Sequence, residues 1–151
     1  MNALLAHLRE EKACVEEFLS VLDREEQAMK KGQFAELIPI TEEKSQLLDR
    51  MAELDVGRVS VQVSMGFEPS RDGADAAAFE GGAETRQIWA ALLALAEKAK
   101  AANHRNGSMV YTHLDFTQKA LHFLQASAQL FYGPDGTRRS TSGAGTRLAL
   151  G

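Results

Sequence analysis

The chain has 151 residues, of which 44% are apolar and only 7% aromatic, with three prolines among them. This length suffices for one domain with a hydrophobic core, and a composition rich in Ala and Leu favours helix over sheet. The formal net charge is −4, and residues 1–65 carry eight basic and thirteen acidic side chains, a net charge of −5. An acidic front half argues against nucleic acid as a main partner.

Cysteine content and hydropathy limit the class of protein further. The single cysteine, Cys14, excludes an internal disulfide bond and is expected to be a small apolar filler at a helix interface. No apolar run approaches the length of a membrane span, and His7, Arg9 and Glu10 interrupt the N-terminal apolar stretch too early for a signal peptide. We therefore expect a cytoplasmic protein that does not insert into a membrane.

Residues 3–30 are predicted to form the first helix, because their apolar residues follow the three–four spacing of a helix with one buried face. Lys12 and Glu26 are read as polar interruptions of that spacing. Gly32 is expected to end the helix, since glycine adopts the left-handed cap conformation at little cost and two lysines precede it. The predicted stripe consists of Leu5, Leu8, Val15, Leu19, Leu22 and Met29, widened by Leu4 and Phe18.

Residues 34–64 are predicted to form a second helix, in which Pro39 starts a fresh helix or kinks an existing one because proline donates no backbone hydrogen bond. The short connection at Gly32-Gln33 makes the two helices antiparallel neighbours. The next segment, 66–83, is rich in glycine and is expected to be a mobile loop. The inward side of the second helix is predicted to carry Phe34, Leu37, Ile40 or Thr41, Lys44, Leu47, Leu48, Met51, Leu54 and Arg58.

Residues 84–106 are predicted to form a third helix, whose start Trp89 would clamp against the hairpin of the first two. The segment Asn103-His104-Arg105-Asn106-Gly107 can end a helix, although the helical phase of the apolar residues continues through it. A break and one long helix are both compatible with this pattern, and we favour a break or kink. The predicted core positions are Ile88, Leu92, Leu95 and Ala99.

Residues 109–131 carry an apolar arc that covers over half of a helix, which is too wide for one partner helix to bury. The first row of this arc, apart from Thr117, is expected to be core. The second row, Phe116, Phe123 and Leu130, is expected to be more exposed and available to another protein, because Lys119 and other polar residues border it. The alternative is that both rows are buried. The first row consists of Val110, Leu114, Thr117, Leu121, Leu124, Ala128 and Phe131.

The remaining residues, 132–151, are rich in Gly, Ser, Thr and Arg and show no periodicity. They cannot bury enough apolar surface to become ordered, so we expect a disordered, flexible C-terminal tail with a small apolar group, Leu148-Ala149-Leu150, near its end. The predicted fold is all-α, an elongated antiparallel bundle or coiled coil of three to four helices over residues 1–131. It consists of a hairpin over 3–64, the loop over 66–83 and the helices within 84–131.

No arrangement of residues in the sequence indicates catalysis. The chain lacks the HExxH and CxxC spacings of metal sites, and its glycine-rich segment follows no strand and lacks a phosphate-loop pattern. Paired carboxylates such as Glu42-Glu43 are typical of solvated helix surfaces. We therefore expect no enzyme, no cofactor and no metal site. The four histidines are His7, His104, His113 and His122. The last two are nine residues apart and are expected to be solvated or half-buried imidazoles, not a metal pair.

Three segments in this order and spacing resemble the FlgN family of bacterial flagellar export chaperones. They are Ile40-Thr41-Glu42-Glu43-Lys44-Ser45 followed by Leu47-Leu48, then Asn103-His104-Arg105-Asn106-Gly107 before an amphipathic helix, and finally Tyr132-Gly133-Pro134-Asp135-Gly136 before a short basic tail. The resemblance covers nearly the whole chain. The departures are the long Gly- and Ala-rich segment 66–83 and the tail that ends in Leu148-Ala149-Leu150-Gly151.

The resemblance implies a small, acidic, all-helical cytosolic protein without catalytic activity. Members of that family bind the hook–filament junction proteins, keep them unpolymerised and deliver them to the flagellar type III export gate. The family uses its C-terminal amphipathic helix for cargo, which here would be the row of Phe116, Phe123 and Leu130. The tyrosine of the third segment, here Tyr132, is associated in the family with docking on the cytoplasmic domain of the export gate.

Two other functions stay open at this point. One is a structural coiled-coil module that dimerises through the second row, and a weak homodimer is compatible with either reading. The other is a bundle chaperone for a different flagellar substrate, such as the filament cap. The sequence alone does not distinguish these, nor does it fix the identity of the cargo or the oligomeric state.

Overall fold

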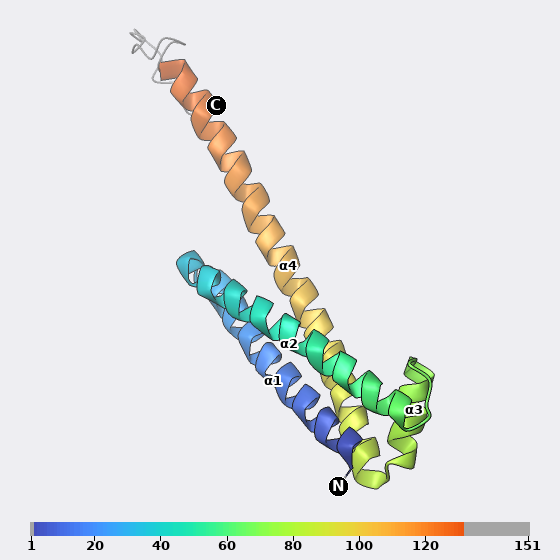
Figure 1. Ribbon diagram of the computed structural model, residues 1–151. Coiled ribbons are helices and arrows are strands. Elements are labelled where there is room, and N and C mark those ends of the chain that lie inside the picture. Colours follow the sequence, from blue (N-terminus) through green and yellow to red (C-terminus); the bar gives the residue numbers. More distant parts are fainter. Residues whose placement is uncertain (1, 132–151) are drawn as a thin grey trace. The chain divides into compact units, whose positions relative to one another are not determined.

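The computed structural model describes residues 2–131, and it describes the side chains of residues 2–127. The predicted tail, including Tyr132, lies outside the described residues. Within them the fold is all-α, as predicted, and no strand occurs. The elements are α1 (Ala3–Lys30), the 3-10 turn η1 (Phe34–Glu36), α2 (Leu37–Ser64), α3 (Arg71–Glu80) and α4 (Ala83–Phe131) (Figure 1).

The chain divides into two units, residues 1–107 and residues from 108 onward, and each is described by itself below. The first unit contains the α1–α2 hairpin, α3 and the first half of α4. One core cluster joins side chains of all four of these helices. The second unit contains the remaining part of α4.

Helix α1 spans the residues predicted for it, and Gly32 follows it with a φ of 69°, as expected of a glycine cap. The predicted polar interruptions were wrong, because the buried charged residues are Glu11 and Glu25 and not Lys12 and Glu26. Every second position of the predicted stripe is replaced by the residue before it, so Leu5 and Leu19 are only half-buried, whereas the other predicted apolar positions are buried as expected. The buried residues with four–three spacing are Leu4, Leu8, Glu11, Val15, Phe18, Leu22, Glu25 and Met29, and Cys14, Val21 and Ala28 beside them are buried as well.

Helix α2 begins at Leu37, and Pro39 is its third residue. The proline fits there because the first N–H groups of a helix have no intrahelical partner. Of the two predicted alternatives, a fresh helix or a kink, the structure shows a fresh helix, which begins two residues before Pro39. Phe34 and Leu48, predicted to face inward, are exposed instead. The buried side chains of α2 are Ile40, Leu47, Leu54, Arg58 and Gln62.

The segment 66–83, predicted to be a mobile loop, contains helix α3, so that prediction was wrong. Ser70 caps the helix, because its Oγ accepts a hydrogen bond from the backbone N–H of Gly73 at 3.1 Å. The side chain of Gln62, on α2, donates to the carbonyl oxygen of Ser70 at 3.1 Å. On the other side, Nε1 of Trp89 donates to Oδ1 of Asp75 at 2.7 Å. The Ser70 cap and the hydrogen bonds from Gln62 and Trp89 stabilise α3 in spite of the high glycine content of the segment.

Helix α4 runs without interruption from Ala83 to Phe131, so the favoured break near Asn106-Gly107 was wrong. An interior glycine costs a helix only about 1 kcal/mol relative to alanine. The side chain of Asn106 does not cap a helix end; it forms buried hydrogen bonds to α1, described below. Trp89 is buried and contacts groups of α2 and α3, in line with the predicted clamp at the start of this helix.

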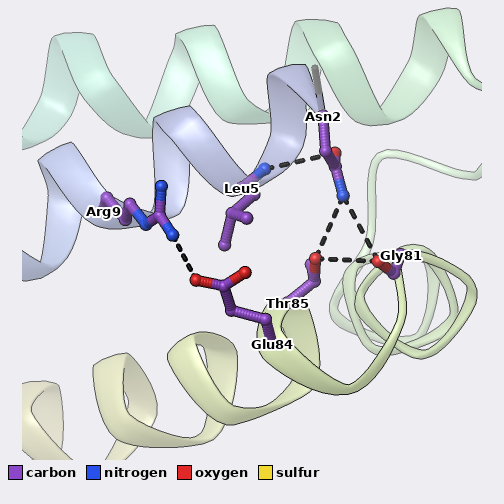
Figure 2. Close-up of polar contacts among 6 residues, drawn as sticks. All are labelled: Asn2, Leu5, Arg9, Gly81, Glu84 and Thr85. Atoms are coloured by element: carbon purple, nitrogen blue, oxygen red, sulfur yellow. Dashed lines mark hydrogen bonds and ion pairs between the residues drawn. The ribbon is translucent and has the colours of Figure 1, made fainter.

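The first residues of α1 and α4 are tied together by side-chain hydrogen bonds (Figure 2). Oδ1 of Asn2 caps α1 by accepting from the N–H of Leu5 at 3.3 Å, while its Nδ2 donates to Oγ1 of Thr85 at 3.0 Å and to the carbonyl of Gly81 at 3.4 Å. Arg9 and Glu84 form an ion pair beside them. Because Asn106 bonds to Leu22 further along, α4 runs parallel to α1 within the first unit.

No helix in the part of the chain that the structure describes combines the length and the apolar character needed to cross a bilayer.

Candidate partner-binding surface

The part of α4 in the second unit exposes large apolar side chains close together in sequence. Exposed side chains of this kind mark interaction surfaces when they are contiguous, whereas scattered ones are normal. Here six occur within fourteen residues of one helix, so the segment is a candidate binding surface. They are Tyr111, Leu114, Phe116, Leu121, Phe123 and Leu124.

The second row was predicted to be the more exposed one. Phe116 is 71% exposed and Phe123 is 50% exposed, which agrees with that expectation of exposure. The side chain of Leu130 and all of Tyr132 lie outside the described side chains. The binding role assigned to these four residues stays a prediction.

The first row was predicted to be core, and for its described leucines this was wrong. Leu114, Leu121 and Leu124 are each more than half exposed, and Val110 is half-buried. The error has a physical reason: apolar spacing identifies the face of a helix that avoids water, but it does not identify the segment that covers this face. Ala128 and Phe131, the last members of the row, lie outside the described side chains.

The second row continues a line of residues that is covered in the first unit. Ile88, Leu95 and Ala102 are spaced by seven, and all three pack against the core cluster. The same spacing leads in sequence to Met109, and then to the second row. The heptad line is thus covered near the start of α4 and exposed at Phe116 and Phe123.

Charge contributes little to this surface. Between residues 108 and 127 the formally charged side chains are Asp115 and Lys119. Nζ of Lys119 lies 3.0 Å from Oδ2 of Asp115, one helical turn away, so the two charges neutralise each other locally. A partner would therefore be held mainly through buried apolar area, and the association would depend only weakly on salt.

The first unit contains two polar layers, each built around a buried glutamate of α1. The sequence pattern placed Lys44 and Arg58 on the inward side of the second helix, but it missed the glutamates that pair with them. The Glu11 layer consists of Glu11, Asp55, Arg58 and Trp89: Nε of Arg58 lies 2.8 Å from Oε1 of Glu11, Asp55 also pairs with Arg58, and the guanidinium lies over the Trp89 ring at 5.1 Å from its centroid. Burial raises the pKa of Glu11 to about 7, although the positive charge of Arg58 acts in the opposite direction.

The Glu25 layer consists of Glu25, Lys44, Asn103 and Asn106. Nζ of Lys44 lies 3.2 Å from both carboxylate oxygens of Glu25 and 2.8 Å from Oδ1 of Asn103. Nδ2 of Asn106 donates to Oε1 of Glu25 at 3.0 Å and to the carbonyl oxygen of Leu22 at 2.8 Å. The layer therefore joins α1, α2 and α4.

A signal for both layers is present in the sequence. Glu11 and Glu25 are fourteen residues apart and fit the four–three spacing of the apolar residues around them. Lys44 and Arg58 are also fourteen residues apart, and the antiparallel hairpin pairs them with the two glutamates in reverse order. Charged residues at regular positions of a stripe, with opposite charges at the same interval on the next helix, identify such layers.

Groups that could support chemistry were also located. Cys14 is buried, its Sγ lies 3.8 Å from the carbonyl oxygen of Leu47, and burial raises the pKa of its thiol. This agrees with the predicted role as an apolar filler. Among the described residues no group of three or more His, Cys, Asp or Glu side chains is placed to hold a metal ion.

Comparison with known proteins identifies the family. The family model described as FlgN protein matches residues 1–140. Two curated relatives, each named flagella synthesis protein FlgN, come from Yersinia enterocolitica and from its serotype O:8 / biotype 1B strain NCTC 13174 / 8081. Each is 25% identical over 153 residues, with 99% of both chains covered. No solved structure matches the chain. The match over most of its length places this chain in the FlgN family.

Proposed function

We propose that this FlgN-family protein is a cytosolic flagellar export chaperone. It binds hook–filament junction proteins, prevents their premature assembly and delivers them to the flagellar type III export gate. The cargo site is the second row, Phe116, Phe123 and Leu130, and Tyr132 docks on the cytoplasmic domain of the gate. The names of the two relatives support a role in flagella synthesis, and the cargo and gate are the further step of this proposal.

The observation that carries the proposal is the exposed apolar surface of α4 between residues 108 and 127. An amphipathic helix of a partner can bury such a surface by laying its own apolar face on it. Because the surface carries few charges, we expect the partner segment to be apolar on its contacting face and its affinity to change little with ionic strength.

The test compares exposed phenylalanines in two places. Phe116→Ala combined with Phe123→Ala should weaken binding of a purified junction protein, measured by calorimetric titration, by a factor of roughly 30 or more, as expected when a binding hot spot is truncated. The melting temperature should change little, because both side chains are at least half exposed in the free protein. Phe79→Ala is the matched control, since Phe79 is 65% exposed on α3.

Two outcomes would count against the proposal. Unchanged affinity of the double variant would place the cargo site elsewhere. Concentration-dependent dimers in sedimentation, lost in the double variant and combined with no affinity for any junction protein, would favour a dimerisation module. A chaperone for another substrate, such as the filament cap, is distinguished by titrating that protein in parallel.

The role of Tyr132 has its own test. Tyr132→Ala should weaken binding to the cytoplasmic domain of the export gate while leaving junction-protein binding and helical content unchanged. A loss of helical content in this variant would instead support a ring that packs on the end of α4.

A further inference from the structure

The Glu25 layer brings together two segments that are far apart in the chain. Lys44 belongs to Ile40-Thr41-Glu42-Glu43-Lys44-Ser45, and Asn103 and Asn106 belong to Asn103-His104-Arg105-Asn106-Gly107. Glu25 of α1 contacts Lys44 and Asn106. The partner-binding surface proposed above uses none of these side chains, so their role has to be sought in the first unit.

The layer occupies positions that apolar residues could fill. Asn106 is 2% exposed and Glu25 is 5% exposed, and the turns on either side of Glu25 in α1 contain the buried residues Leu22 and Met29. Burying a charged pair and an amide is at best weakly stabilising compared with apolar side chains of similar size. Stability alone therefore does not explain a polar layer at this depth.

Polar residues in a helical stripe are best known for fixing the register of packed helices, because an apolar stripe with seven-residue spacing can also pair after a shift of one heptad. Here a shift of α4 by seven residues along α1 would move the amide of Asn106 away from the carbonyl oxygen of Leu22 and the carboxylate of Glu25, to which it now donates. The layer would then contain buried polar groups without partners, which costs about 1–3 kcal/mol for each group.

The geometry points to the Glu25 layer as the register lock of the first unit: Glu25, Lys44 and Asn106 hold α4 in a single alignment on the α1–α2 hairpin. The amide nitrogen of Asn106 donates both to the carboxylate of Glu25 and to the backbone carbonyl of Leu22. Both bonds form only when Asn106 lies beside these two residues, so they fix the position of α4 along α1. Lys44 extends the lock to α2 and to Asn103.

The test measures alignment directly. Spin labels at Ser20→Cys on α1 and Gln87→Cys on α4, both exposed positions, are placed in a Cys14→Ala background of the full chain. Electron–electron dipolar spectroscopy on dilute protein should give one narrow distance. In Glu25→Leu/Lys44→Leu/Asn106→Leu the protein should stay helical, while a second population displaced by about 10 Å, the length of one heptad, should appear.

Two further variants keep the test decisive. Arg24→Leu/Glu43→Leu removes an exposed ion pair between the same two helices of the hairpin, 2.8 Å long, and should leave the single distance unchanged. If the triple variant does not fold, Lys44→Glu should disturb the distance by placing two carboxylates together. One narrow, unshifted distance in the folded triple variant, or in Lys44→Glu, would overturn the proposal.

Discussion

Two stretches of the same helix can be compared directly. Between residues 85 and 106 of α4, the large apolar side chains Trp89 and Leu92 are buried in the core cluster. Between residues 108 and 127, Leu114 and Phe116 are more than half exposed. Both stretches also carry the same heptad line, of which Ile88 and Leu95 pack against the core cluster while Phe116 is exposed. The period of a sequence thus predicts which face of a helix is apolar, whereas the burial of this face depends on contacts with residues far away in the chain.

The largest expected effect comes from truncating one leucine in each stretch. Leu92→Ala should lower the free energy of unfolding by about 2–5 kcal/mol, because it leaves a cavity in the core. Leu114→Ala, on the same helix, should lower it by less than about 1 kcal/mol, because the side chain is 57% exposed. Urea unfolding of both variants measures the difference, and equal losses would mean that the second stretch is covered in solution.

The pH dependence of stability should come from the Glu11 layer, which contacts the covered stretch through Trp89. Burial raises the pKa of Glu11 in the folded protein to about 7, from 4.5 in a solvated glutamate, with Arg58 and Asp55 facing the carboxyl from α2. The folded state therefore binds this proton more tightly. The stabilisation from protonated Glu11 is fully present below about pH 4.5 and is lost as the pH rises through about 7. The free energy of unfolding falls by up to roughly 3 kcal/mol over this range.

Glu11→Gln tests this directly, because it removes the titrating group and retains a polar side chain of similar shape. The stability of the wild type should fall relative to that of the variant between about pH 5 and about pH 8. Parallel pH profiles of the two proteins would contradict the expectation. Hydrogen bonds from Lys30 and Trp89 lower the pKa values of Glu26 and Asp75. These two groups therefore act in the opposite sense: the stability that they contribute is lost as the pH falls, and only at more acidic pH.

A smaller effect is expected at the start of the covered stretch. Trp89→Phe keeps an aromatic ring beside Arg58 but loses the hydrogen bond that Nε1 donates to Asp75. Stability should fall by about 1 kcal/mol, and backbone amides of α3 should exchange with solvent faster than those of α1. Hydrogen exchange that changes equally in both helices would show that α3 is not anchored through this bond.

The smallest effect should come from the charged pair of the exposed stretch. Lys119→Ala removes an exposed one-turn ion pair with Asp115, which contributes less than about 0.5 kcal/mol. Thermal melts at low and high salt should be nearly superimposable with those of the wild type. A large salt-dependent loss would show that this stretch depends on charge and not on apolar burial.

Much of the fold was predictable from local signals. The bounds of α1 follow from its periodicity and from Gly32, and the position of Pro39 marked the beginning of α2. Helix α3 was missed because glycine content was weighted above the cap at Ser70 and the alanine run after it. The break predicted in α4 rests on Asn106-Gly107 as a helix end, whereas the side chain of Asn106 bonds to α1 and the helix continues.

The candidate surface was only partly predictable. The exposure of Phe116 and Phe123 followed from their polar neighbours, but the exposure of Leu121 did not, because spacing carries no information about long-range cover. The glutamates of the two polar layers were missed for a related reason. Charged residues such as Glu25 are assigned to the solvent by default. The partners of Glu25, Lys44 nineteen residues away and Asn106 on α4, are what reduce the cost of burying it.

The Glu25 layer also orders events during synthesis of the chain. Glu25 and Lys44 are translated early, while Asn103 follows Lys44 by 59 residues. At 5–20 residues per second, roughly 3–12 s separate the two. During that interval the nascent hairpin carries its ion pair but lacks α4 over its apolar stripe, and the final alignment is set only when Asn103 and Asn106 emerge from the ribosome. A slowed ribosome between codons 45 and 103 should therefore lengthen the exposure of this stripe to other proteins.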